Sequence, residues 1–163
     1  MPADYVETAI RLAAAAVLGC LLGLTRDMAD KPAGMRTMGL VALGAALITL
    51  VAHNAFPEAH PDAQSRVLQG VIQGVLTGVG FIGAGAVLHN HEQGRVRGLT
   101  TAAIVWVAAA AGVACGLGEW GPVSIGAVVA LLLIVVLHPF ERRIERRARD
   151  RRKKTGDDPS NGL

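Results

Sequence analysis

Residues 70–88 read GVIQGVLTGVGFIGAGAVL, a glycine-rich, apolar and uncharged stretch on which the choice of fold depends. Within it, Gly78, Gly80 and Gly83 spell G-x-G-x-x-G, the fingerprint of a dinucleotide-binding loop between a strand and a helix. Such a site also needs a preceding strand and an acidic residue about 20 positions further on. Glutamine and glycine precede Gly78, and the region Arg97–Val105 has no Asp or Glu. The pattern therefore argues against a nucleotide site.

The same stretch fits a membrane helix better. The apolar run Val67–Leu88 has about the 20 residues that are needed to cross the hydrocarbon core of a bilayer. Its glycines recur every fourth residue, and two overlapping GxxxG motifs allow another helix to approach closely. The first and fourth apolar runs carry the same small-residue spacing, so we expect these helices to pack against one another or against a second copy. The predicted packing positions are Gly19, Gly23, Gly70, Gly74, Gly78, Gly112 and Gly116.

The composition supports a membrane protein throughout. The chain is 52% hydrophobic but only 4% aromatic, and its alanine and glycine suit close-packed helices in lipid. We predict an all-α membrane protein with about five transmembrane helices, of which the second and fifth are short. The predicted helices cover residues 6–24, 38–54, 67–88, 99–117 and 121–138. They form one transmembrane domain at 1–140, followed at 141–163 by a basic juxtamembrane helix and a disordered tail.

The distribution of basic residues predicts the orientation in the membrane. Nearly all of the 16 Lys and Arg residues lie in the loops 25–37 and 89–98 and in the tail after Phe140, whereas none precedes Arg11. We therefore expect the N-terminus outside and the C-terminus in the cytoplasm. The tail also predicts contact with anionic lipid. Glu7, four residues before Arg11, predicts an interfacial helical ion pair.

Two features near the N-terminus need separate interpretation. Val17–Cys20 resembles a lipoprotein cleavage box, but a secretory leader begins with basic residues, and here Asp4 and Glu7 come first. We interpret this segment as the first membrane helix. Cys20 then lies near its inner end and Cys115 near the outer end of the fourth helix, roughly 15–20 Å apart in height. A disulfide tolerates Cα separations of only about 7 Å, so we predict no intrachain bridge.

Two basic stretches precede the helices that would start at the cytoplasmic side. Their threonines can cap the helix N-termini, whose free N–H groups and positive dipole ends attract anions. A lipid head group, a phosphate compound or an acidic protein segment would fit. The alternative is an ordinary set of basic inner loops, in which Asp27 simply pairs with Arg26. The candidate anion or partner site comprises Arg26, Asp27, Lys31, Arg36, Thr37, Arg95, Arg97, Thr100 and Thr101.

A polar stripe of Gln69, Gln73 and Thr77 accompanies the glycines of the third helix. Uncharged amides in lipid usually form hydrogen bonds between helices, and a conduction path is the alternative. The histidines match no familiar metal-ligand spacing, and no nucleophile–base–acid set is visible. We therefore predict no metal site, no cofactor, no enzymatic activity and no nucleic-acid partner.

Several motifs together resemble a known family. KPAGMRT at 31–37, LVALGAALITL at 40–50, GVGFIGAGAVL at 78–88 and GRVRGLTTAAIVWVAAAAGVACGLG at 94–118 are similar, in order and spacing, to the bacterial MgtC/SapB family. The resemblance implies a multi-pass protein of the bacterial inner membrane. It also implies a link to growth in low magnesium and, in some pathogens, to survival inside host cells. The best-known members resemble regulators of other membrane machines, including the ATP synthase, more than magnesium pumps.

The chain departs from the family pattern in several places. The usual G-x-E-R-E after the first helix is Gly23-Leu24-Thr25-Arg26-Asp27, without the first acid, and Met38 stands where a histidine is common. Asp62 is displaced from Ser65-Arg66. Longer members carry a folded cytoplasmic C-terminal domain, so we expect a short member with only the basic tail.

Two functions remain open at this point. The resemblance implies a regulatory, partner-binding membrane protein linked to low magnesium or virulence-like stress, acting on a membrane-protein partner or as a homo-oligomer. The alternative is a component of a transporter or channel for Mg²⁺ or another ion. A divalent-cation pathway needs intramembrane carboxylates, and Glu7 is the only one well inside a predicted span, with Arg11 beside it. This favours the regulatory interpretation.

Overall fold

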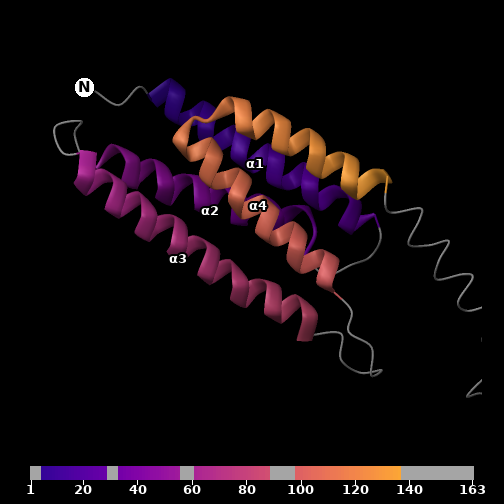
Figure 1. Cartoon of the computed structure of the whole chain (residues 1–163). Helices are drawn as coiled ribbons and strands as arrows, with labels where there is room; N and C mark the ends of the chain where they lie inside the picture. The colour runs from indigo at the N-terminus through magenta and orange to yellow at the C-terminus, as the bar shows by residue number, and fades with distance from the viewer. Residues whose placement is uncertain (1–4, 29–32, 56–60, 89–97, 137–163) are drawn as a thin grey trace, which may run out of the picture. The chain divides into compact units, whose positions relative to one another are not determined.

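The computed structural model of the chain describes residues 5–28, 33–55, 61–88 and 98–136 (Figure 1). Regular structure within these ranges is helical, without any strand, which confirms the predicted all-α fold. The helices are α1 (Tyr5–Asp27), α2 (Met35–Asn54), α3 (Pro61–Leu88), α4 (Leu99–Leu117) and a shorter apolar helix, Trp120–Val136. Predictions for Lys31, Arg95, Arg97 and the basic tail lie outside the described residues.

Four helices are long and apolar enough to cross a membrane: α1, α2, α4 and the part Asp62–Val87 of α3. The 19 residues of α4 extend about 28 Å at 1.5 Å per residue, close to the thickness of the hydrocarbon core. The chain divides into two compact units, Met1–Val128 and Val129–Leu163. The boundary falls within the Trp120–Val136 helix, so the packing described below belongs to the first unit.

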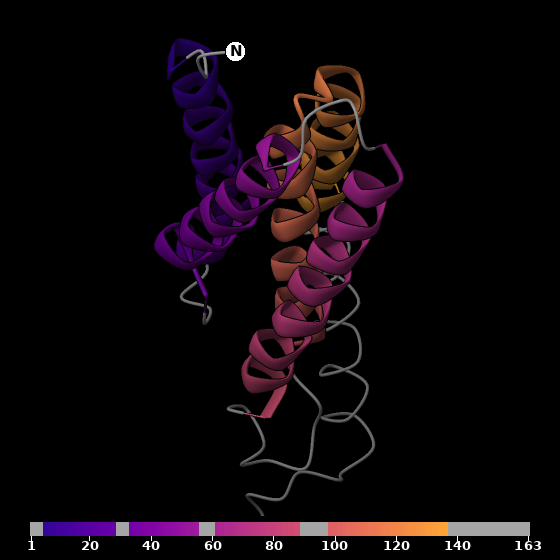
Figure 2. The same ribbon diagram turned by 90° about the vertical axis from the view of Figure 1, so that its left-hand side faces the viewer.

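Helix α4 occupies the centre of the first unit. It contacts α1, α2 and α3, and Figure 2 shows α1 and α3 on opposite sides of it. In an apolar segment of 18 residues, long enough to cross a membrane, 50% of α4 is buried by the other helices, against 17% of α3. Contacts of Arg11 with Gly116 and of Arg26 with Thr101 make α1 antiparallel to α4. The close approaches of Gly23 to Met35 and of Gly19 to Ala42 make α2 antiparallel to α1, as successive membrane spans must be.

Small residues bring the backbones of α1, α2 and α4 together. A Cβ added at Gly116 would lie 2.6 Å from the carbonyl oxygen of Ala46, and one at Gly23 would lie 2.7 Å from the Cα of Met35. At Gly19 and Gly112 an added Cβ would overlap backbone oxygens of α2. Only glycine allows these approaches, so four of the predicted packing positions form the seam between these helices.

The glycines of α3 behave differently: the prediction that they pack against the first and fourth helices is wrong, whereas packing against a second copy stays a prediction. Gly70, Gly74 and Gly78 are exposed, and an added Cβ at any of them would meet nothing within 4 Å. The side of α3 that meets α4 contains Gly83, where an added Cβ would lie 3.3 Å from the Cβ of Ala102. Gly74 lies nine residues from Gly83, which is two and a half helical turns, so it points the opposite way.

Candidate functional site

The first candidate region lies where α1 ends and α2 begins. The N-cap of α2 is Gly34, which has no side chain to bind the free N–H groups of the first turn. Asp27, the last residue of α1, takes this role, because the backbone N–H of Met35 donates to its Oδ2 at 2.9 Å. A carboxylate at this position also complements the positive end of the helix dipole. The predicted cap, Thr37, lies instead inside the first turn of α2, so that prediction was wrong.

Arg26, beside Asp27, joins α1 to α4. It is only 6% exposed, and its guanidinium donates to the hydroxyl of Thr101, which is fully buried in the first turn of α4. Gly98 forms the N-cap of α4 in a left-handed conformation, φ 94°, and makes no side-chain cap bond. The predicted capping of α4 by Thr100 or Thr101 is therefore wrong as well. Thr100 is exposed, and Thr101 binds Arg26 instead.

We call Arg26, Asp27, Met35 and Thr101 the Arg26 junction, since together they connect the end of α1 to the starts of α2 and α4. The junction changes the predicted anion site. The N-terminus of α2 already holds a carboxylate, and Arg26 is buried against α4, so neither is presented to a ligand. Arg36 is exposed on the first turn of α2 and does not belong to the junction.

The opposite end of α4 has its own charged cap, which the sequence did not predict. Arg11 forms the expected ion pair with Glu7, Nε to Oε1 at 2.8 Å. Its Nη1 also donates to the carbonyl oxygen of Gly116 at 3.1 Å. A cation at the last carbonyls of a helix complements the negative end of its dipole. The pairing of Glu7 with Arg11 was visible as a four-residue spacing, but the contact with Gly116 spans 105 positions and depends on how the helices pack.

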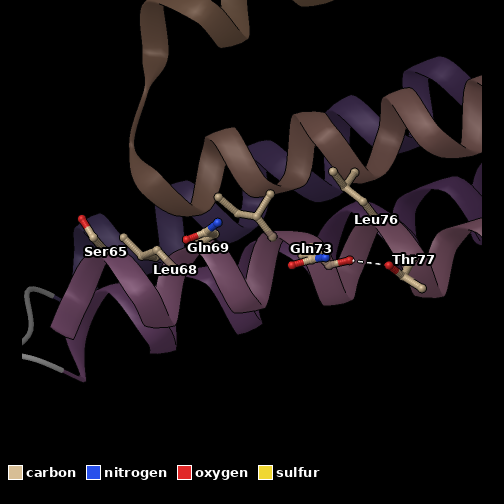
Figure 3. Close-up of a pocket in the computed structure, with 7 residues that line it drawn as sticks. Ser65, Leu68, Gln69, Gln73, Leu76 and Thr77 are labelled. Carbon is tan, nitrogen blue, oxygen red and sulfur yellow. Dashed lines mark hydrogen bonds between the residues drawn. The ribbon is translucent and has the colours of Figure 1, made fainter. Parts of the chain in front are cut away.

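The second candidate region is an open groove of about 820 Å³ along α3. Thr77 donates its hydroxyl to the backbone carbonyl of Gln73 at 2.7 Å, so this donor is satisfied within the helix. The side-chain amides of Gln69 and Gln73 are exposed and make no hydrogen bond to another described residue. Figure 3 shows these polar side chains along one side of α3. The groove is lined by Ser65, Leu68, Gln69, Ile72, Gln73, Leu76 and Thr77.

The chain is similar to several bacterial proteins. It is 37% identical to SrpB of Synechococcus elongatus over 85% of this chain and 78% of that protein. It is 37% identical to YhiD of Escherichia coli strain K12, whose name proposes a magnesium transporter, over 88% of this chain and 65% of that protein. It is 35% identical to MgtC of Salmonella typhimurium over 83% of this chain and 54% of that protein. No solved structure matches the chain.

The chain thus spans less than two thirds of YhiD and about half of MgtC, but most of SrpB. Its helices are those of a multi-pass membrane protein, with four of them long and apolar enough to cross a bilayer. Residues 12–143 match the MgtC family and include all of α2, α3 and α4. On the family match and these relatives together, the chain belongs to the MgtC family.

Proposed function

We propose that this protein is a regulator in the bacterial inner membrane that binds another membrane protein and serves adaptation to low magnesium. The name of one relative, YhiD, connects the family to magnesium. Because the chain covers only part of those relatives, the regulatory activity, the partner and any role in virulence-like stress belong to the proposal. The observation that carries it is the exposed surface of α3 formed by Gln69, Gly70, Gln73 and Gly74.

Along α3, an exposed polar stripe and an exposed glycine stripe lie next to each other, about 100° apart around the helix axis. Gln69 and Gln73 present amides without a hydrogen-bond partner among the described residues, inside a segment of membrane length. Hydrocarbon offers no hydrogen bonds, so burying an unpaired amide in it costs roughly several kcal/mol of free energy. Gly70 and Gly74 beside them leave room for a second backbone. A transmembrane helix with amide or hydroxyl side chains would satisfy both, at about 0.6 to 2 kcal/mol for each hydrogen bond.

The membrane orientation belongs to the same proposal. The bias of Lys and Arg favours an N-terminus outside and a C-terminus in the cytoplasm. The Arg26 junction then faces the cytoplasm, and the basic tail lies next to anionic lipid. Reporter fusions at the two termini test this orientation, because a fusion that is active only outside should work at the N-terminus alone.

Photocrosslinking from α3 tests the proposed docking face. A photoreactive amino acid at Gln73 should give a discrete protein adduct in native membranes from cells grown in low magnesium. The control is the same amino acid at Leu40, which is 67% exposed on α2 and away from this groove. The mass of the adduct distinguishes a different partner from a second copy of this chain. If positions 73 and 40 give the same lipid adducts and no protein adduct, the docking face is disproved.

The alternative is a transporter or channel component, which the name of YhiD and the glutamines in the open groove favour. Against it, Glu7 is paired with Arg11 and Asp27 caps α2, so both carboxylates already serve the fold. Uptake of Mg²⁺ into proteoliposomes that contain only the purified protein would reverse this ranking, provided that Gln73→Leu abolishes the uptake.

We also propose a cytoplasmic site for an anion or a partner, with fewer residues than the sequence predicted. It now consists of exposed Arg36 and Thr100 together with Lys31, Arg95 and Arg97, which lie outside the described residues. A lipid head group, a phosphate compound or an acidic protein segment would fit it. Neutralising Arg36 and Arg97 together should abolish the growth phenotype in low magnesium while membrane insertion stays normal. A double variant with wild-type growth would eliminate this site.

A further inference from the structure

Two buried polar atoms on α2 have no hydrogen-bond partner among the described residues. One is Oγ1 of Thr49, whose side chain is fully buried. The other is Nδ1 of His53, one helical turn further along the same face. Unpaired polar atoms in a protein interior cost about 1–3 kcal/mol each and are rare in native proteins. Two of them at neighbouring positions therefore need an explanation.

The surroundings of Thr49 supply further polar groups. A Cβ added at Gly116 would lie 3.1 Å from the Cβ of Thr49, so this side chain faces the last turn of α4. The carbonyl oxygen of Gly116 accepts a hydrogen bond from Arg11 and keeps a second lone pair. Helices α1, α2 and α4 thus bring polar groups together at one end of their seam, whereas at Gly112 the atoms nearest to an added Cβ are all backbone atoms of Ala42.

From this arrangement we infer that Thr49 and His53 form a binding site for a buried water molecule between α2 and α4. Side chains at i and i+4 of a helix are about 5–6 Å apart at their Cβ atoms. A water molecule that makes two hydrogen bonds of about 2.8 Å spans such a distance. Buried waters usually make about three hydrogen bonds, and the carbonyl oxygen of Gly116, on the turn of α4 that Thr49 faces, is the candidate third partner.

The inference is independent of the proposed function, because it concerns the seam between α2 and α4 and not the face of α3. His53 is the last residue but one of α2, so the site lies close to the end of the helix from which water could enter. The seam would be dry and closely packed around Gly112 and hydrated around Gly116.

Water-edited solid-state NMR of the protein in lipid bilayers tests the site. Magnetisation from water should reach the side chains of Thr49 and His53 quickly, and should not reach Val105, which is equally buried in α4. Thr49→Val keeps the shape of the side chain and removes the hydroxyl, so the water signal at His53 should disappear. Thr49→Ser keeps the hydroxyl and should preserve that signal.

The wild-type measurement is decisive by itself, even if a variant fails to fold. A Thr49 side chain that receives as little magnetisation from water as Val105 would overturn the inference. It would also be overturned if Thr49→Val left the water signal at His53 unchanged, because the hydroxyl would then not bind the water.

Discussion

The seam of α1, α2 and α4 and the outer face of α3 carry the same small-residue spacing in opposite surroundings. Gly112 and Gly116 lie against the backbone of α2, whereas Gly70 and Gly74 meet nothing within 4 Å. The difference comes from the partner. Helix α2 runs parallel to α4 and offers Ala42 and Ala46 at the same four-residue spacing, so two small-residue stripes match. A GxxxG pattern therefore predicts that a helix can be approached closely, but it does not identify the approaching helix.

The largest expected effect separates these two glycine faces. Gly112→Leu should prevent folding, because even its Cβ would overlap the backbone oxygen of Ala42, which is unable to move without displacing α2. Overpacking of a core typically costs about 1–3 kcal/mol, and a clash with backbone should exceed this. The matched variant Gly74→Leu should leave the monomer folded. The yield of monodisperse protein and its melting temperature in detergent measure both effects. Equal losses in the two variants would refute the distinction between the faces.

The Arg26 junction should give the next largest effect. Thr101→Val keeps the size of the side chain but removes the acceptor for the buried guanidinium of Arg26. Hydrogen bonds to charged groups contribute about 1.5–3 kcal/mol, so we expect destabilisation of that order. Thr100→Val is the control, because Thr100 is exposed on the same turn. Thermal unfolding of both variants in lipid nanodiscs measures the difference, and a stable Thr101→Val protein would count against the junction.

The sequence predicted the fold well because a membrane span is a local property. Length and hydropathy over about 20 residues decide whether a segment crosses a bilayer, and α4 is a clear example. The contacts of Arg11 with Gly116 and of Arg26 with Thr101 were not predictable in this way. They join positions 105 and 75 residues apart, and they exist only once α1 lies antiparallel to α4.

The caps show a different limit of sequence reasoning. Threonine near a helix start suggested an N-cap, but the caps of α2 and α4 are the glycines Gly34 and Gly98. A glycine cap leaves the free N–H groups to a more distant side chain, and at α2 that is Asp27, eight residues before Met35. An acid at the end of one helix, followed closely by a glycine before the next, is a signal that could have indicated this contact.

Removing the Asp27 cap should have a smaller effect than removing the acceptor for Arg26. Asp27→Ala leaves the N–H of Met35 without its acceptor, and losing such a cap costs about 1 kcal/mol. Asp27→Asn keeps an acceptor oxygen and should recover most of this stability. Melting temperatures of the two variants should therefore differ, with the alanine variant lower. If the two melt together below the wild type, the negative charge matters more than the hydrogen bond.

The outer face of α3 should give the smallest effect on stability and the largest on binding. Gln73→Leu replaces an exposed amide that makes no hydrogen bond to another described residue, so the melting temperature of the isolated protein should stay within error of the wild type. In native membranes, the same variant removes one of the hydrogen bonds proposed between α3 and its partner, and crosslinks from a photoreactive amino acid at Gly74 should weaken.

Gln64→Leu provides the contrast, because Gln64 donates to the carbonyl oxygen of His53 at 3.0 Å and serves the fold. The Gln64→Leu variant should have a lower melting temperature. The fraction that stays folded should still form crosslinks from Gly74. The opposite result, with Gln73 needed for folding and dispensable for crosslinking, would mean that the exposed face of α3 is no different from the closed seam.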